Sequence, residues 1–371
     1  MLSYVDDFLV LGLKEDCEFF GEELGRVFDG VTCQSGEVIE HLGVEVNMQE
    51  SGVIRLKMRK HIIKAVDNFK ETHQVMLDKG LLTAKTLKVL DSPCSDKLMK
   101  VDPDSPKLPA FAKEAFHSII AQCHYIGKRT RGECLATITT LMTRITESTY
   151  DDWFKLRRLI SFLDDTLDQY LVMDAKGIWL EVYIDASFAS HPDGKGHGGA
   201  VITLGGAPIY MFSAKQRLTS TSSCESEVIV AAQIGKMIQF FVQYLHEQGY
   251  QGLPPCHIWE DNESALSLWR TGRSMSKETR HIDLRFFYLH DLQERGIITL
   301  DHLDTKLMVA DLFTKGVDNA TFKDLSWKLN NSHSELDIQG KTILYESVTI
   351  ILPVQELEDI DPFLEIEWCS G

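Results

Sequence analysis

YIDASFAS, at residues 183–190, completes a strand and carries the first of four carboxylates that lie far apart in the sequence. In residues 180–184 every second side chain is aliphatic, an alternation that is typical of a half-buried β-strand. This strand is expected to end at Asp185. Because α/β sheets place their sites at the carboxyl ends of strands, Asp185 is a candidate site residue.

Two more strands are expected directly after it. GGAVITL at residues 198–204 and APIYMF at residues 207–212 are short apolar runs. Gly205 and Gly206 join them, and this dipeptide readily takes the positive φ of a tight hairpin turn. The sequence therefore predicts a three-stranded antiparallel meander.

A long helix is expected to follow the meander and to carry the second carboxylate. Hydroxyl residues at 221–223 offer N-caps, and Gly249 marks the end of the apolar-periodic run that follows them. Two glutamates, Glu225 and Glu227, stand near the start of this helix. Periodicity alone leaves both as candidates.

The next segments alternate strands and helices. A short apolar strand at residues 256–259 places Asp261 at its carboxyl end, just before a helix through Leu266. The elements expected after it are a helix at 279–295, a strand at 297–303 and a helix that carries Asp311 in its first turns. The order β-β-β-α-β-α-β-α predicts an α/β domain with a mixed sheet, in which the meander is followed by alternating strands and helices.

Four acids in this order fit the chemistry of a two-metal phosphodiesterase. They are Asp185, Glu227, Asp261 and Asp311. Hydrolysis of a phosphodiester needs an activated water, a stabilised leaving oxygen and charge neutralisation at phosphorus, which two Mg²⁺ ions about 3.5–4 Å apart supply. Mg²⁺ prefers oxygen ligands, and Mn²⁺ is the alternative ion. Any one of these acids alone is more typical of a helix cap, so the prediction of a two-ion site depends on the set.

The sequence words around these acids resemble one protein family. They are YIDASFAS at 183–190, SSCESEVIVAA at 222–232, WEDNESAL at 259–266, TRHIDLRF at 279–286 and VADLFTK at 309–315. In order and text they resemble the ribonuclease H domain of a copia-type retrotransposon Pol polyprotein. The resemblance implies a ribonuclease H-like fold, hydrolysis of the RNA strand of an RNA–DNA hybrid, and Glu227 rather than Glu225 as the catalytic glutamate. Cys224 departs from the family's usual threonine.

The N-terminal residues carry a weaker resemblance to the same polyprotein. YVDD at residues 4–7 is flanked by apolar residues, which predicts a hairpin with Asp6 and Asp7 at its tip, and it resembles the reverse-transcriptase palm motif. HLGVEV at 41–46 and IIAQCHYIGKRTRGE at 119–133 resemble later segments, the second with Gly-Glu where the family has Pro-Asp. In the family the fingers and a third palm carboxylate precede this motif. We therefore expect a truncated palm and thumb that does not copy a template alone.

Composition and resemblance together predict five regions. They are a truncated palm remnant at 1–50, a thumb-like region with a Pro-rich linker at 51–110, a helical connection at 111–177, a ribonuclease H domain at 178–330 and an acidic tail at 331–371. This tail contains nine acidic residues and one basic residue, Lys341. No role is assigned to the tail.

A net charge of −17 argues at first against a nucleic-acid partner, because such binding draws on Lys and Arg contacts to phosphates. Local clusters matter more than the sum. Basic residues gather at 55–64 and at Lys128, Arg129 and Arg131. The nucleic-acid contacts expected near the four acids are Lys215, Arg217, Lys277, Arg280, His281 and Arg285.

The eight cysteines form no C-x-x-C pair, which indicates reduced thiols in an intracellular protein. The expected location is the cytoplasm, a virus-like particle or the nucleus. No run of 18 apolar residues predicts a membrane span, and no secretory signal is visible at the start.

Three functions follow from these patterns. The first is a metal-dependent ribonuclease H that acts on an RNA–DNA hybrid, favoured by the ordered acids. The second is a non-catalytic retroelement relic or nucleic-acid-binding fragment. The third is a subunit that completes a split reverse transcriptase, for which the partner is the rest of a Pol polyprotein or a reverse-transcriptase chain. Hybrid cleavage distinguishes the first from the second, and co-purification of a partner bearing the fingers identifies the third.

Overall fold

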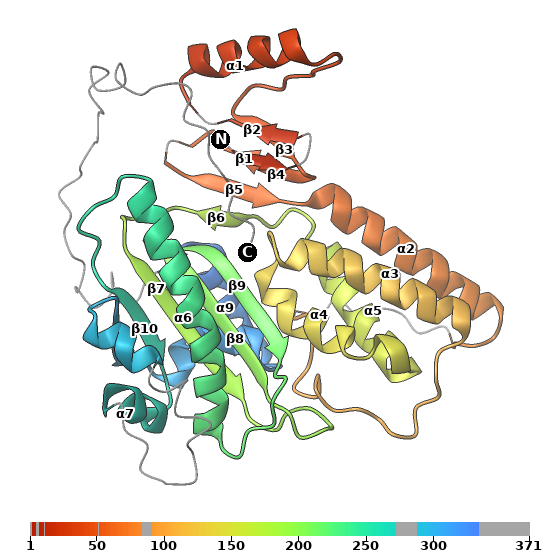
Figure 1. Cartoon of the computed structure of the whole chain (residues 1–371). Coiled ribbons are helices and arrows are strands. Elements are labelled where there is room, and N and C mark those ends of the chain that lie inside the picture. Colours follow the sequence, from red (N-terminus) through yellow and green to blue (C-terminus); the bar gives the residue numbers. More distant parts are fainter. Residues whose placement is uncertain are drawn as a thin grey trace. The chain divides into compact units, whose positions relative to one another are not determined.

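A five-stranded mixed sheet forms around the expected meander (Figure 1). In the computed structural model its strands are β7 (Leu180–Ser187), β8 (His197–Leu204), β9 (Ala207–Lys215), β10 (Cys256–Glu260) and β11 (Ile298–His302). β7, β8 and β9 pair antiparallel, β10 runs parallel to β7, and β11 runs parallel to β10. The strand order is β11-β10-β7-β8-β9. The α/β class and the mixed sheet with its meander are therefore confirmed.

The structure describes residues 2–4, 7–10, 12–50, 52–83, 91–271 and 288–333. Several residues singled out in the sequence lie outside these ranges, namely Asp6, Lys277, Arg280, His281 and Arg285. Most of the expected helix at 279–295 also lies outside them, although residues 288–294 are helical. The acidic tail is outside from residue 334 onward.

One long helix, α6 (Ser223–Glu247), covers a face of this sheet (Figure 1). Ser222 is its N-cap, and the Ser222 hydroxyl accepts a hydrogen bond from the Glu225 backbone N–H at 3.1 Å. Val228, Ile234 and Ile238, at helical spacing, are buried in the core of the sheet. Among the described helices α6 alone is long and apolar enough to cross a membrane by length and composition, and half of that apolar window is buried.

Asp311 does not lie in a long helix. It lies in the 3₁₀ helix η5 (Val309–Phe313), which follows the shorter 3₁₀ helix η4 (Thr305–Leu307). The next helix, α9 (Asn319–Asn330), starts separately, because Asp318 caps it by accepting hydrogen bonds from the backbone N–H groups of Ala320 and Thr321. The prediction of one helix with Asp311 in its first turns is therefore wrong.

Strand β7 is longer and more buried than its sequence pattern predicts. Asp185 pairs with Gly199 and the strand continues to Ser187, so Asp185 does not end it. All residues of β7 except Ser187 are buried. A Cβ on Gly198 of β8 would touch Val230 of α6, whereas one on Gly199 would touch Phe313 of η5. Both faces are thus covered, and the prediction of a half-buried strand is wrong.

Residues 91–99, part of the expected Pro-rich linker, pack against the segment between η5 and α9. The Ser92 hydroxyl donates a hydrogen bond at 2.9 Å to the Asn319 side-chain oxygen, 227 residues along the chain. A Cβ on Gly316 would lie 2.0 Å from the Ser95 backbone oxygen. Glycine at 316 is therefore required for this close approach.

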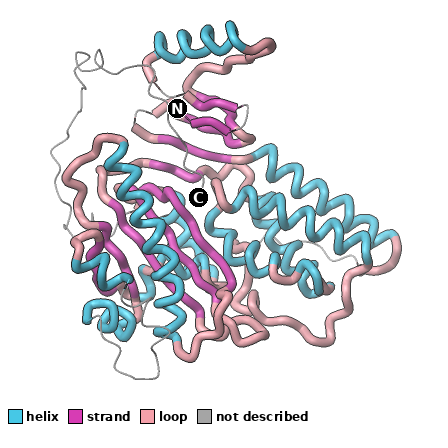
Figure 2. Tube along the Cα trace, in the orientation of Figure 1, coloured by secondary structure: helices cyan, strands magenta, loops and turns pink. Residues whose placement is uncertain are grey.

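A second, antiparallel sheet lies earlier in the chain. It contains β3 (Val38–His41), β4 (Val44–Asn47), β5 (Ile54–Lys57) and β6 (Leu171–Met173). The expected N-terminal hairpin is present as β1 (Leu2–Tyr4) paired with β2 (Asp7–Leu9), with Tyr4 opposite Asp7. The remaining helices, cyan in Figure 2, include α1 (Lys14–Val27), α2 (Arg59–Asp78), α3 (Ala110–Gly127), α4 (Leu135–Met142), α5 (Tyr150–Asp165) and α7 (Glu263–Thr271). The division of the chain into five regions stays a prediction.

Gly199→Ala tests how tightly η5 is seated on the sheet. The added Cβ would meet the Phe313 Cβ and the Thr314 Cγ2 at 2.6 Å, so we expect the free energy of unfolding to fall by about 1–3 kcal/mol. Chemical denaturation of the full chain measures it.

Gly25→Ala in α1 is the matched control. Nothing lies within 4 Å of its added Cβ, and alanine favours a helix, so stability should be unchanged or slightly higher. Equal effects of the two substitutions would contradict the close seating of η5.

Candidate metal centre

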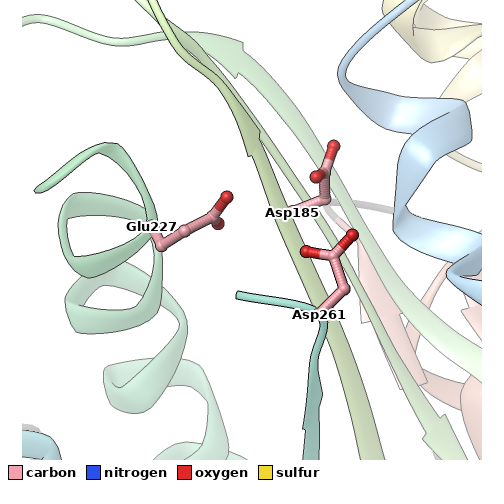
Figure 3. A group of neighbouring side chains, drawn as sticks. All are labelled: Asp185, Glu227 and Asp261. Carbon is pink, nitrogen blue, oxygen red and sulfur yellow. The ribbon is translucent and has the colours of Figure 1, made fainter. Parts of the chain in front are cut away.

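Three of the four predicted acids meet in space. Asp185 comes from β7, Glu227 from the second turn of α6, and Asp261 directly follows β10 (Figure 3). One carboxylate oxygen of each lies within 4.8 Å of the others. Asp185 and Glu227 are buried, with 4% and 3% of their surface exposed, whereas Asp261 is partly exposed. The cluster therefore opens to solvent on the Asp261 side.

The fourth acid, Asp311, joins the cluster through Asp185 and a lysine. The Lys315 ammonium lies 2.6 Å from Asp311 Oδ1 and 3.7 Å from Asp185 Oδ2. The Thr314 hydroxyl donates a hydrogen bond to the same oxygen of Asp185. The turn after η5 thus holds Asp311 and Asp185 together.

The structure separates the two glutamates at the start of α6. Glu225 turns back over the helix end, where its carboxylate accepts hydrogen bonds from the Thr221 backbone N–H at 2.6 Å and the Thr221 hydroxyl at 2.8 Å. It is therefore a capping residue. Glu227, two residues later, extends toward Asp185 and Asp261 (Figure 3).

A fifth carboxylate, Glu260, lies beside the cluster and was missed in the sequence. It is the last residue of β10, fully buried, and its Oε1 accepts a hydrogen bond from the Asn262 backbone N–H at 3.0 Å. Strand alternation puts it on the same face as the core residue Ile258. An acid at a core-facing strand position was the available signal, but the predicted strand stopped at Trp259.

Burial and crowding raise the proton affinity of these acids. Burial raises the pKa of Glu227 well above its ordinary value, and the nearby Glu260 and Asp185 carboxylates raise it further. Burial also raises the pKa of Glu260. The pKa of Asp311 is raised to about 7 by burial and by Asp185, against the opposing effect of Lys315. Like charges brought together out of water require a proton or a cation between them.

The donor set fits a hard divalent cation. Among the described residues, Glu227 Oε2 and Glu260 Oε2 are buried and have no hydrogen-bond partner. Such atoms are costly unless they are protonated or bind a cation. The cluster offers carboxylate oxygens only, which is the ligand type that Mg²⁺ and Mn²⁺ take.

A buried hydrogen-bond chain supports η5 from the sheet. The Ser213 hydroxyl donates to the Phe313 backbone oxygen at 2.7 Å, and His197 Nε2 lies 2.9 Å from Ser213 Oγ. His191 Nε2 lies 2.9 Å from His197 Nδ1, and Thr139 of α4 lies 2.8 Å from Ser213 Oγ. Burial lowers the pKa of His197 to about 3 and that of His191 to about 4, so both rings are neutral at pH 7. With each Nε2 protonated, His191 donates to His197, His197 donates to Ser213, and Ser213 donates to the Phe313 backbone oxygen.

The predicted nucleic-acid contacts have different surroundings. Lys215 pairs with Asp193 at 2.8 Å, and Arg217 is exposed. Lys277, Arg280, His281 and Arg285 lie outside the described residues, and so does Asp6, whereas Asp7 is exposed at the start of β2. Their roles stay predictions.

The cluster at residues 128–131 is not a free phosphate-binding surface. Arg131 is buried in an ion pair with Glu133 at 2.6 Å, and Lys128 donates a hydrogen bond to the Met211 backbone oxygen at 2.9 Å. Arg129 stacks 3.5 Å from the centre of the Tyr125 ring. These groups join α3 to its neighbours.

Comparison with known proteins finds similar Pol polyproteins. No family model matches the chain. It is 26% identical over 333 residues to the retrovirus-related Pol polyprotein from transposon RE2 of Arabidopsis thaliana, covering 89% of this chain and 21% of that one. It is 23% identical over 342 residues to the Pol polyprotein from transposon TNT 1-94 of Nicotiana tabacum, covering 90% and 24%.

The chain is similar to copia-type retrotransposon Pol polyproteins. The resemblance read from the sequence words is confirmed. This Pol-related chain spans about a fifth of the length of the relatives that it matches. Among solved structures, LC11-RNase H1 from compost is similar at 15% identity and a TM-score of 0.30, covering 39% of the Pol-related chain and 96% of that one.

Asp311→Asn tests the raised pKa. Because the folded state holds the Asp311 proton more tightly than the unfolded chain, its contribution to stability is complete below pH 4 and is lost as the pH rises to about 7. Without metal, the variant should therefore gain stability over the wild type across this window, by a few kcal/mol at pH 8.

Denaturation in EDTA between pH 4 and 8 measures this difference. Asp324→Asn, an exposed acid of α9, is the control and should show no such trend. A difference between Asp311→Asn and wild type that stays constant with pH would show that Asp311 is not perturbed.

Ser213→Ala tests the support of η5. The Phe313 oxygen and the His197 ring each lose a buried partner, so we expect a loss of about 1–3 kcal/mol in the free energy of unfolding. The exposed Ser118→Ala in α3 should leave stability unchanged. An equally stable Ser213→Ala would rule out a supporting role for this hydroxyl.

Proposed function

We propose that this Pol-related chain is a metal-dependent endonuclease that hydrolyses the RNA strand of an RNA–DNA hybrid. The observation that carries the proposal is the meeting of Asp185, Glu227 and Asp261 within 4.8 Å, beside Asp311. These acids come from distant segments and stand in the words that resemble the ribonuclease H domain. A structural role alone does not account for so many buried carboxylates in one place.

The acids supply the ligands of the proposed reaction. Two Mg²⁺ ions, or Mn²⁺ ions, would provide an activated water and stabilise the leaving oxygen when bound. Asp185, fixed by Thr314, stands centrally, with Glu227 and Asp261 on one side and Asp311 on the other. The Thr305 hydroxyl donates a hydrogen bond at 2.7 Å to Asp261 Oδ2 and so orients the most exposed ligand.

Substrate approaches from the open side of the cluster. Asp261 and Lys315 are the partly exposed groups there, while Asp185 and Glu227 lie deeper. The exposed Arg217 is available for phosphates of the hybrid. The RNA strand would be recognised by its 2′-hydroxyls, which distinguish RNA from DNA at a given position.

Cleavage of a labelled RNA–DNA hybrid by the full chain tests the proposal, with Mg²⁺ and then with EDTA. We expect hybrid-specific cleavage that disappears in EDTA and leaves single-stranded RNA intact. Asp261→Asn should lower the rate by about 100-fold or more, since even residues that only orient metal ligands are worth 10–100-fold.

Asp324→Asn is the matched control and should cleave like the wild type, because Asp324 lies exposed on α9. Absence of cleavage by a folded wild-type chain at millimolar Mg²⁺ would refute the enzyme and leave a nucleic-acid-binding fragment or a partner-dependent subunit.

A further inference from the structure

A lysine occupies the place where a cation would join two of the acids. The Lys315 ammonium lies 2.6 Å from Asp311 Oδ1 and 3.7 Å from Asp185 Oδ2. Lys315 is four residues after Asp311, and the turn after η5 places both side chains on the same side. The side chains of the two acids are 6% exposed and that of Lys315 is 40% exposed.

This ammonium divides the acids into two groups. Asp185, Glu227 and Asp261 have ligand oxygens within 4.8 Å of one another, and Asp311 is not in that group. Asp311 instead contacts the lysine, which also approaches Asp185. One potential ion position is thus framed by three carboxylates, and a second, between Asp185 and Asp311, holds a positive charge that belongs to the protein.

The two cations cannot share the second position. A divalent ion takes carboxylate oxygens at about 2.0–2.1 Å and repels an ammonium that lies against the same oxygens. The lysine side chain is partly exposed, so it can leave toward solvent. The Thr314 hydroxyl, by contrast, is uncharged and buried, and its hydrogen bond to Asp185 is compatible with a bound ion.

We propose that Lys315 is a built-in competitor for the second metal ion, so that the two ions bind in order. This inference rests on the proposed metal centre. The first ion enters among Asp185, Glu227 and Asp261. The second binds between Asp185 and Asp311 only by displacing the Lys315 ammonium, and its affinity is therefore weakened. Without metal, the same ammonium offsets the repulsion between Asp185 and Asp311 and stabilises the fold.

Titration of the full chain with Mn²⁺, followed by calorimetry and by the spectroscopic signal of free Mn²⁺, tests the order. The wild type should bind one ion more tightly than the other. Lys315→Gln should strengthen the weaker step by about tenfold or more and leave the tighter step nearly unchanged. It should also lower the melting temperature in EDTA, and Mn²⁺ should restore it.

Two further variants keep the result interpretable. Lys315→Arg retains the charge and adds a forked donor that suits two carboxylates, so the weaker step should stay as weak as in the wild type or become weaker. This variant also serves if Lys315→Gln does not fold without metal. Lys323→Gln, on the exposed surface of α9, makes the same change in net charge and should alter neither step.

The outcomes separate the inference from the proposed function. If the wild type binds two ions and the weaker step is unchanged or weakened in Lys315→Gln, then Lys315 does not compete with the second ion. That result would leave the proposed nuclease function unaffected. Equal strengthening by Lys323→Gln would refute the competition by Lys315 as well, because net charge alone would then be the cause. A wild type that binds no Mn²⁺ would overturn both.

Discussion

The pairing of β10 with β7 is the constraint on which the site depends. Trp259 lies opposite Tyr183 in this parallel pair, so Asp261 and Asp185, each two residues further along, reach the same end of the sheet. A buried carboxylate fixes the register. Glu181 accepts hydrogen bonds from the indole N–H groups of Trp179 and Trp259, at 3.2 and 3.1 Å, and from the Tyr183 hydroxyl at 3.4 Å. A shift by one residue would bury Glu181 without the Trp259 donor and would point Asp261 to the other face.

Two kinds of buried acid therefore coexist in one sheet. Glu181 accepts hydrogen bonds from neutral donors. Glu227 and Glu260 each keep a buried oxygen without a partner in the described structure, and their pKa values are raised by burial. The hydrogen bonds of Glu181 stabilise the strand register. The buried oxygens of Glu227 and Glu260, by contrast, are left for a proton or a cation to bind. This contrast supports the assignment of the second group as a candidate metal centre.

Much of this arrangement was predictable because it is local. Periodicity located the meander and α6, and Gly205 and Gly206 do take positive φ at 53° and 87°. Asp185, Glu227 and Asp261 do converge, although Asp185 lies two residues before the end of its strand. Long-range packing decided the rest. β7 is buried on both faces because η5 returns to it from far along the chain, and no pattern within residues 180–187 contains that information.

Three other features were not predicted from the sequence. Arg131 looks like a surface cation in sequence but finds Glu133 in the interior. Glu260 was not predicted because the expected strand stopped at Trp259, although alternation along β10 points Glu260 inward. The histidines His191 and His197 gain their role only from Ser213 and Phe313, which lie on other elements.

The contact of Ser92 with Asn319 can form only late in synthesis, because its two partners lie far apart in the chain. During synthesis the first partner leaves the ribosome 227 residues before the second, and Gly316 must then settle against Ser95. Asp311 lies just before this late-docking segment. The residues of the three-acid cluster have all emerged once Asp261 has been released, whereas Asp311 emerges 50 residues later. A ribosome-bound chain would therefore carry an incomplete set of carboxylates until this region has been translated.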